Sequence, residues 1–224
     1  MTADQPALRI AFAPGVTVGK WTRRWQERHP ELPLEVFAVP EYEGAQVLAD
    51  GRATLSFVRL PVERDGLSVI RLYGEIAVLV VPRDSELAEL ESVPEARVTE
   101  LAQVADYSPT RPVKDAVALV AAGVGFLRLP HSLARLHARK DVVAVPIEGA
   151  AETEIAVVWI RDETTESVEE FVGVVRGRTE ASSRANPTPP TPKVRVQKTR
   201  PQRAQSPRPP QKRSGGKTRK RGSR

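Results

Sequence analysis

The stretch that decides the fold is Leu8-Arg-Ile-Ala-Phe-Ala-Pro14, followed at once by Gly15-Val-Thr-Val-Gly19. The first part has the apolar composition of a buried strand, and Pro14-Gly15 is a turn signal. A helix expected over 16–28 carries the apolar side chains of Val18, Trp21 and Trp25 on one face. A buried strand that leads directly into a helix is typical of an open α/β sheet, where small ligands bind at the strand ends.

Strand and helix patterns alternate from this turn to about residue 178. We expect strands at 34–39, 54–60, 67–72, 75–81, 126–129, 142–147 and 154–160. We expect helices at 43–50, 113–122, 131–138 and 165–178, with 84–101 helical in pieces around Pro94. Because a helix separates the first two strands, we expect these strands to be parallel. The stretch Ala102–Pro112 is polar and rich in turn residues.

Charge divides the chain into two parts. Residues 179–224 hold 14 lysines and arginines against one glutamate, which leaves 20 basic and 27 acidic residues in 1–178. The high pI therefore belongs to the tail, which is rich in proline and has only Val194 and Val196 as large apolar residues. Such a segment cannot bury enough surface to offset the entropy of ordering, so we expect 179–224 to be disordered.

Composition excludes several classes of function. The chain has no cysteine, which rules out disulfides, thiolate metal sites and a cysteine nucleophile. No serine, histidine or carboxylate pattern matches a catalytic or metal-binding motif, so we expect no enzyme activity, no cofactor and no metal. The first residues lack a signal-peptide pattern and the apolar runs are too short to span a bilayer. We therefore expect a cytoplasmic protein without a membrane partner.

Six phrases, taken in order, carry a family resemblance. They are Leu8-Arg-Ile-Ala-Phe, Trp25-Gln-Glu-Arg-His-Pro30, Leu48-Ala-Asp-Gly-Arg-Ala-Thr-Leu-Ser-Phe-Val-Arg-Leu-Pro61, Gly74-Glu-Ile-Ala-Val-Leu-Val-Val-Pro-Arg-Asp-Ser85, Val120-Ala-Ala-Gly-Val-Gly-Phe-Leu-Arg-Leu-Pro130 and the helix with Val168-Glu-Glu-Phe. Together they resemble the effector-binding (substrate-binding) domain of LysR-type transcriptional regulators over about 7–178.

The resemblance implies a two-lobed α/β fold of the type 2 periplasmic-binding-protein kind, which pairs into a homodimer. We expect lobe I at about 7–82 plus a helix at 164–178, and lobe II at about 83–163. The family has a longer stretch between Leu101 and Val113, with a strand that lines the cleft. We therefore expect a shortened second lobe that lacks part of the wall opposite Leu8–Thr17. The family's N-terminal winged helix-turn-helix is also absent here, so base reading by a recognition helix is not expected.

Three segments are candidates for a ligand site between the lobes. They comprise the first turn, the end of the third strand and a second lip: Pro14, Gly15, Val16, Thr17, Arg59, Leu60, Pro61, Gly125 and Arg128. Backbone N–H groups at a helix start and the Arg59 guanidinium suit an anionic metabolite. The alternatives are structural: Thr17 as an ordinary N-cap, Arg59 as a solvated strand end, and Gly125 in a turn after a helix.

The tail is the second candidate site. Its basic residues, interleaved with Pro, Gln and Ser, suit contact with nucleic-acid phosphates without reading of sequence. The candidates are Lys193, Arg195, Lys198, Arg200, Arg203, Lys212, Arg213, Lys217, Arg219, Lys220 and Arg221. The leading hypothesis is thus a non-enzymatic sensor of a small anionic metabolite in transcription regulation, with a nucleic-acid-binding tail. The alternative function is a nucleic-acid-associated structural protein whose α/β domain is a non-sensing scaffold. For the tail alone, the alternative is a disordered segment that only confers solubility.

Overall fold

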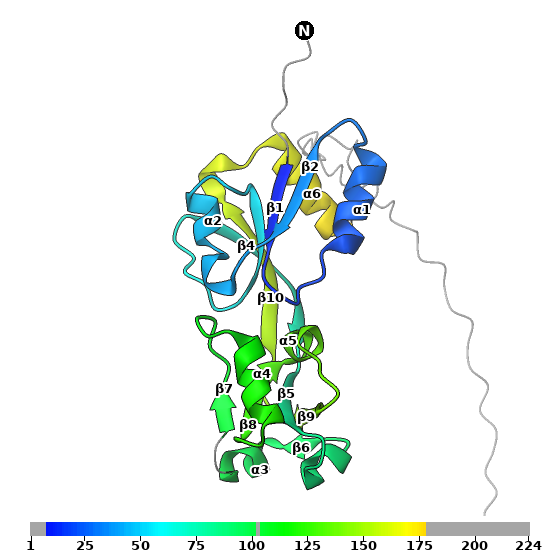
Figure 1. The fold of residues 1–224 in the computed structure, drawn as a ribbon. Helices are drawn as coiled ribbons and strands as arrows, with labels where there is room; N and C mark the ends of the chain where they lie inside the picture. Colours follow the sequence, from blue (N-terminus) through cyan, green and yellow to red (C-terminus); the bar gives the residue numbers. More distant parts are fainter. Residues whose placement is uncertain (1–7, 102–103, 178–224) are drawn as a thin grey trace, which may run out of the picture. The chain divides into compact units, whose positions relative to one another are not determined.

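A computed structural model describes residues 8–101 and 104–177 of the chain. These residues form two five-stranded sheets, which fall in one compact unit (Figure 1). Strand order is β2-β1-β3-β10-β4 in the first sheet and β6-β9-β5-β8-β7 in the second. The predicted two-lobed α/β architecture is therefore confirmed at the level of one sheet per lobe.

The first sheet contains the strand predicted within the Leu8–Pro14 segment. Its strands are β1 (Leu8–Phe12), β2 (Leu34–Ala38), β3 (Leu55–Arg59), β4 (Leu67–Glu75) and β10 (Thr153–Ile160). β1 pairs in parallel with both β2 and β3, as the helix between the first two strands predicted. β10 runs antiparallel to β3 on one side and to β4 on the other.

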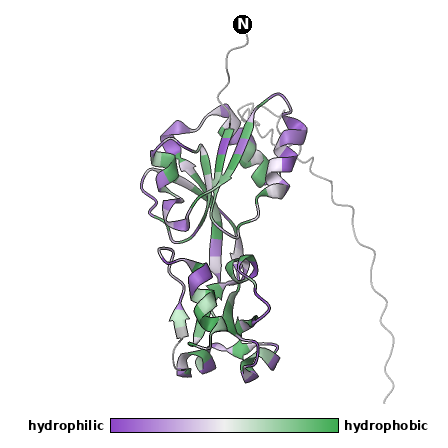
Figure 2. Cartoon of the chain, in the orientation of Figure 1, coloured by the Kyte–Doolittle hydropathy of each residue, from purple (hydrophilic) through white to green (hydrophobic). Residues whose placement is uncertain are grey.

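Alternation along these strands builds a core on each face of the first sheet. Leu8 and Ile10 of β1 pack on the face that carries α1 (Gly19–Arg28) and α6 (Glu166–Val175). Ala11 packs on the other face, against α2 (Gln46–Ala49). Figure 2 shows the apolar residues running along the strands and the polar residues on the outer sides of the helices.

Aromatic rings hold α1 and α6 to the sheet. Trp21 stacks on Phe57 of β3 with ring centroids 5.1 Å apart. Phe171 of α6 meets Trp25 and Phe57 edge-on at 5.7 and 6.3 Å. The helical spacing of the two tryptophans, which predicted a core face, is therefore confirmed.

The second sheet is built around β5, which runs antiparallel to both β8 and β9. Its strands are β5 (Ala77–Pro82), β6 (Val93–Pro94), β7 (Val104–Asp106), β8 (Phe126–Pro130) and β9 (Val142–Glu148). α3 (Glu95–Glu100) covers one face, and α4 (Val113–Ala121) and α5 (His131–Leu136) cover the other. Three short 3-10 helices, η1 (Glu41–Glu43), η2 (Glu86–Glu89) and η3 (Arg161–Glu163), complete the described part of the chain.

The predicted lobe boundaries are wrong at two strands. β5, which we assigned to the first lobe (7–82), pairs in the second sheet, and β10, which we assigned to the second lobe (83–163), lies inside the first sheet. Residues 77–81 of β5 and 155–159 of β10 are all apolar and buried, so their composition does not indicate which of the two sheets each strand enters. The chain therefore passes between the sheets twice, once after β4 and once before β10.

Two local expectations also need correction. α1 begins at Gly19 with Val18 as its N-cap residue, and no side chain caps it, so Thr17 is not an N-cap. The turn-rich stretch Ala102–Pro112 contains β7, which pairs in parallel with β8. The expectation that this wall of the second lobe is missing is therefore wrong.

The predicted disordered tail, 179–224, lies outside the described residues, as do its candidate nucleic-acid contacts. Within 8–101 and 104–177, no helix has the length and apolar character needed to cross a membrane.

Candidate functional site

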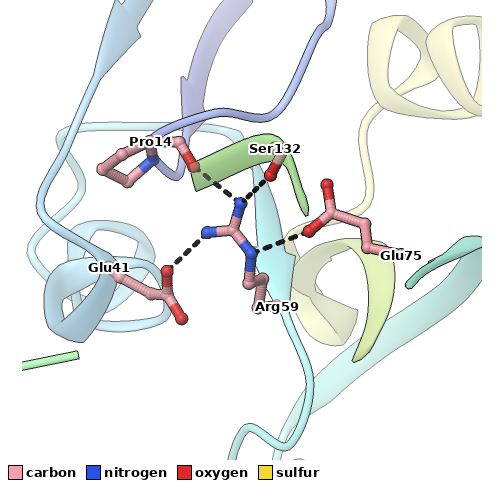
Figure 3. A network of polar contacts seen from close by, with 5 residues as sticks. All are labelled: Pro14, Glu41, Arg59, Glu75 and Ser132. Atoms are coloured by element: carbon pink, nitrogen blue, oxygen red, sulfur yellow. Dashed lines mark hydrogen bonds and ion pairs between the residues drawn. The ribbon is translucent and has the colours of Figure 1, made fainter. Parts of the chain in front are cut away.

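The most heavily bonded side chain of the candidate site is Arg59, the last residue of β3 (Figure 3). Only 2% of its side chain is exposed. Its Nε donates to Glu75 Oε2 at 3.0 Å, and its Nη1 donates to Glu41 Oε2 at 2.5 Å. Its Nη2 donates both to the Pro14 carbonyl at 2.8 Å and to Ser132 Oγ at 2.7 Å. Arg59 is therefore a saturated, buried cation, and the alternative of a solvated strand end is excluded.

The four acceptors come from separate parts of the chain. Pro14 follows β1, Glu41 begins η1, and Glu75 ends β4. Ser132 lies in α5, which packs on the second sheet. The Arg59–Ser132 hydrogen bond therefore joins the two sheets. Two carboxylates surround one guanidinium, so this group of ionised side chains carries one excess negative charge.

Glu41 has a second partner, Tyr107, which follows β7. Burial raises the pKa of the Tyr107 phenol, and a hydrogen bond to the Glu41 carboxylate raises it further. Tyr73 of β4 is affected in the same way: burial raises its pKa first, and the Glu75 charge adds to the shift. Both phenols therefore stay protonated beside the carboxylates that hold Arg59.

Gly15 lets the first turn approach this network closely. Its φ is +81°, a conformation that L side chains rarely adopt. A Cβ at this position would lie 2.8 Å from Ser132 Oγ and 3.2 Å from Arg59 Nη2. Glycine at position 15 is thus required both by the backbone and by the two side chains facing it.

The largest cavity at this site has a volume of about 460 Å³, and both sheets contribute to its walls. The first sheet contributes the end of β3 and the residues after it, together with Glu41. The second sheet contributes Asp106, Tyr107, Pro109 and the end of β8. The residues that line it include Glu41, Arg59, Leu60, Pro61, Asp106, Tyr107 and Arg128.

A smaller cavity of about 280 Å³ lies beside the first turn. It is lined by Gly15, Thr17, Tyr73, Glu75, His131, Ser132 and Arg135, among others. Gly15, Glu75 and Ser132 also surround Arg59, so the two cavities share one polar network.

Arg128 contributes a second guanidinium to the larger cavity. Its Nη1 donates to Glu95 Oε1 at 2.6 Å, and about a quarter of its side chain is exposed. Like Arg59, it already has a carboxylate partner. Both predicted cationic residues therefore line the cleft, and each is paired within the protein.

The other candidates from the sequence divide into three groups. Pro14 binds Arg59 through its carbonyl, while Leu60 and Pro61 line the larger cavity. Val16 is buried in the core of the first sheet rather than presented to the cleft. Gly125 lines a separate groove along α4 with Leu119 and Val124, so it is not brought together with Arg128 in the larger cavity.

Sequence reasoning missed four polar residues of the network and its walls: Glu41, Glu75, Tyr107 and Ser132. Glu41 begins η1 and Glu75 ends β4, and nothing in their spacing marks them as partners of a residue 16–18 positions away. Ser132 lacks the Gly-x-Ser-x-Gly setting of a nucleophile, so the sequence pattern does not mark it as a functional residue. Its position two residues after Pro130, in the first turn of α5, is the only local signal that could have indicated a role.

Comparison with known proteins agrees with this geometry. A family model described as the LysR substrate binding domain matches residues 2–116, just over half of the chain. A search of the curated proteins gives no significant match.

Solved structures with this fold include the BenM effector binding domain with its effector benzoate. That chain is 18% identical with a TM-score of 0.63, and the match covers 81% of this chain and 96% of that one. Full-length CbnR complexed with its target DNA is 16% identical with a TM-score of 0.63, covering 76% and 70%. An OxyR mutant from Corynebacterium glutamicum is 17% identical with a TM-score of 0.62, covering 76% and 64%.

At identities this low, the similarity to solved structures shows only the fold. The match to the family model shows the family. The two sheets, the cleft with Arg59 and the matched model all agree with the resemblance read from the sequence. This chain belongs to the LysR substrate binding domain family.

Proposed function

We propose that this chain is a non-enzymatic effector-binding domain that takes a small, anionic metabolite in the larger cavity and acts in transcription regulation. Homologues in the family sense small-molecule effectors in this setting. The single observation that carries the proposal is a cavity of about 460 Å³, lined from both sheets, with a buried guanidinium in its wall. Cavities of this size and position hold small molecules.

The proposed roles follow from the contacts. An anionic group on the ligand would bind Arg59 beside the Pro14 carbonyl and Gly15, with Leu60 and Pro61 providing apolar contact. Arg128 would contribute from the opposite wall, and Thr17 from the adjoining smaller cavity. A ligand that contacts both sheets would favour one arrangement of the lobes, which changes the surface offered to a partner.

A regulatory rather than catalytic role agrees with the side chains present. Ser132, the nucleophile-type residue of the network, accepts a hydrogen bond from a guanidinium instead of donating to a base. In the described ranges, no group of three or more histidines and carboxylates is arranged to hold a metal ion. We propose that the protein acts in the cytoplasm and pairs into a homodimer, as its resemblance to LysR regulators implies.

The experiment is a thermal-shift screen of carboxylate and phosphate metabolites with the full chain, followed by calorimetry on the hits. A ligand at 100 times its dissociation constant should stabilise the fold by about 2.7 kcal/mol. Arg128→Met should abolish that shift, whereas Arg71→Met, an exposed arginine of β4, should keep it. Absence of any stabilising compound would refute the sensing role.

The tail forms the second half of the proposal. Its net positive charge suits contact with nucleic-acid phosphates. Substituting glutamine for the basic residues of 193–221 should abolish gel shifts with any duplex, and wild-type binding should weaken steeply with salt. If the substituted chain binds as well as wild type, the tail has no such role.

One observation favours a different function. Arg59 is already saturated by partners within the protein, as in a scaffold that has stopped sensing. A nucleic-acid-associated structural protein would then use the tail alone. That function predicts nucleic-acid binding that no small molecule alters, which the two experiments above test together.

A further inference from the structure

Glu41 occupies the face of Arg59 that an incoming anion needs. Its carboxylate binds Nη1 of Arg59 and lines the larger cavity. The other arms of the guanidinium are less accessible, because Glu75 is 6% exposed and Nη2 holds both Pro14 and Ser132. Glu41 is 12% exposed and lies on a three-residue helical turn. An anion from solvent therefore reaches Arg59 by replacing Glu41.

Replacement leaves the Glu41 carboxylate inside the cleft without its cation. Its remaining partner is the Tyr107 hydroxyl, a neutral donor. A buried carboxylate that loses its counter-charge is strongly destabilised, and a second anion bound beside it adds repulsion. A ligand with a carboxylate alone therefore exchanges one ion pair for another and adds an uncompensated charge.

Among the described residues that line the cavity, none supplies a spare positive charge to offset that cost. Arg128, the other cation of the larger cavity, is bound by Glu95. Two guanidinium groups thus face Glu41, Glu75, Glu95 and Asp106. Asp106 is exposed to the cavity, and its carboxylate makes no hydrogen bond or ion pair with any other residue in the described ranges. A ligand that covers Asp106 must compensate this charge as well.

We propose that Glu41 is the specificity-determining residue of the cleft, and that it selects a ligand carrying a cationic group next to its anionic group. The anionic group takes the place of Glu41 on Arg59, and the cationic group binds the released Glu41 carboxylate, with Asp106 on the facing wall of the same cavity. α-Amino acids are the simplest class with this charge pattern. The inference rests on the proposed function, since it describes the ligand of the same cavity.

The test uses matched probes that differ only in charge. Calorimetry at low salt with the full chain compares each apolar or aromatic L-amino acid with its deaminated carboxylate and its decarboxylated amine, for example phenylalanine, 3-phenylpropionate and phenethylamine. In at least one set we expect the amino acid to bind about tenfold or more tightly than either relative. Glu41→Gln should reduce this preference to about threefold or less, because the carboxylate can now reach Arg59 without leaving an anion behind. Glu35→Gln, an exposed glutamate of β2, serves as the matched control and should keep the wild-type ratio.

Each outcome decides something. If a deaminated carboxylate binds the wild-type protein as tightly as its amino acid, the selection is refuted and the anionic-effector proposal stands. If none of the three classes binds, the selection by Glu41 is refuted, and the metabolite screen described above decides the anionic-effector proposal. The wild-type ratio decides the question even if Glu41→Gln fails to fold. An unchanged ratio in a folded Glu41→Gln protein would remove Glu41 from the role.

Discussion

The Nη2 atom of Arg59 lies 2.7 Å from Ser132 Oγ, although the two residues belong to different sheets. The same guanidinium is bonded to Glu41 and Glu75, so one side chain neutralises charge in the first sheet and connects it to the second. This arrangement makes the cleft a structural as well as a binding feature, and it leads to the following predictions.

Replacing Arg59 by methionine should lower the free energy of unfolding by about 3–5 kcal/mol, because the buried Glu75 carboxylate and the largely buried Glu41 carboxylate lose their counter-charge. Urea unfolding measures the change. The matched control is Arg71→Met, in which an exposed ion pair to Glu154 is lost at a cost of about 1 kcal/mol or less. Equal costs for the two variants would contradict the buried-cation account.

Gly15→Ala should be much more destabilising than Gly123→Ala. The two glycines have similar positive φ values, +81° and +75°, so the backbone strain is alike. Only at Gly15 would the added Cβ lie within 2.8 Å of Ser132 Oγ, whereas at Gly123 it meets nothing within 4 Å. We expect a difference of about 1–3 kcal/mol between the variants in thermal or urea unfolding. The prediction fails if the two lose the same stability.

Stability should decrease at alkaline pH partly through Tyr107. The pKa of this phenol is raised above its usual value near 10, first by burial and then by Glu41. As pH rises past the pKa of the unfolded chain, the unfolded state loses this proton while the folded state keeps it, so the free energy of unfolding falls. The stabilisation is complete below about pH 10.

Tyr107→Phe should therefore flatten the decline in the urea midpoint between about pH 9 and pH 11. Tyr42→Phe, at a residue that is 60% exposed, provides the comparison. Parallel declines in wild type and in the Tyr107→Phe protein would show that the phenol does not titrate in this way.

Phe171→Ala should cost about 3–5 kcal/mol, because it removes a fully buried ring that packs edge-on against Trp25 and Phe57. Val175→Ala, one turn further along α6 and only partly buried, should cost far less. Guanidinium chloride unfolding by tryptophan fluorescence measures both. A small loss at Phe171 would mean that the two helices are held mainly by other contacts.

Much of the first sheet could be predicted from the sequence, because local patterns decide it. The β1 run and the tryptophan face of α1 correctly indicated a strand, a turn and a helix, and the helix between them predicted the parallel pairing with β2. The expected strand after residue 54 and the apolar face of α6 are also confirmed. Each of these signals lies within one element.

The errors concern relationships between distant segments. β5 and residues 155–160 of β10 are uniformly apolar, so no alternation indicates which sheet they enter. β7 has three residues, too few for a periodic pattern. Arg59, a predicted ligand-binding residue, lines the larger cavity, but its partner Ser132 is 73 positions away, and their contact depends on where α5 packs. The position of Arg59 at the end of a predicted strand indicated this residue from the sequence. Its hydrogen-bond partners could be identified only from the three-dimensional structure.

The position of β10 also bears on how the protein is made. β10 fills the gap between β3 and β4, yet its first residue, Thr153, is synthesised 94 positions after Arg59 ends β3 and 78 positions after Glu75 ends β4. Until residue 160 emerges, β3 and β4 each present an unpaired edge that can pair with another nascent chain. Truncated mRNAs that end before the codon for residue 153 should therefore give aggregated protein rather than a soluble, folded first lobe. Complete synthesis is thus a condition for the first lobe to fold.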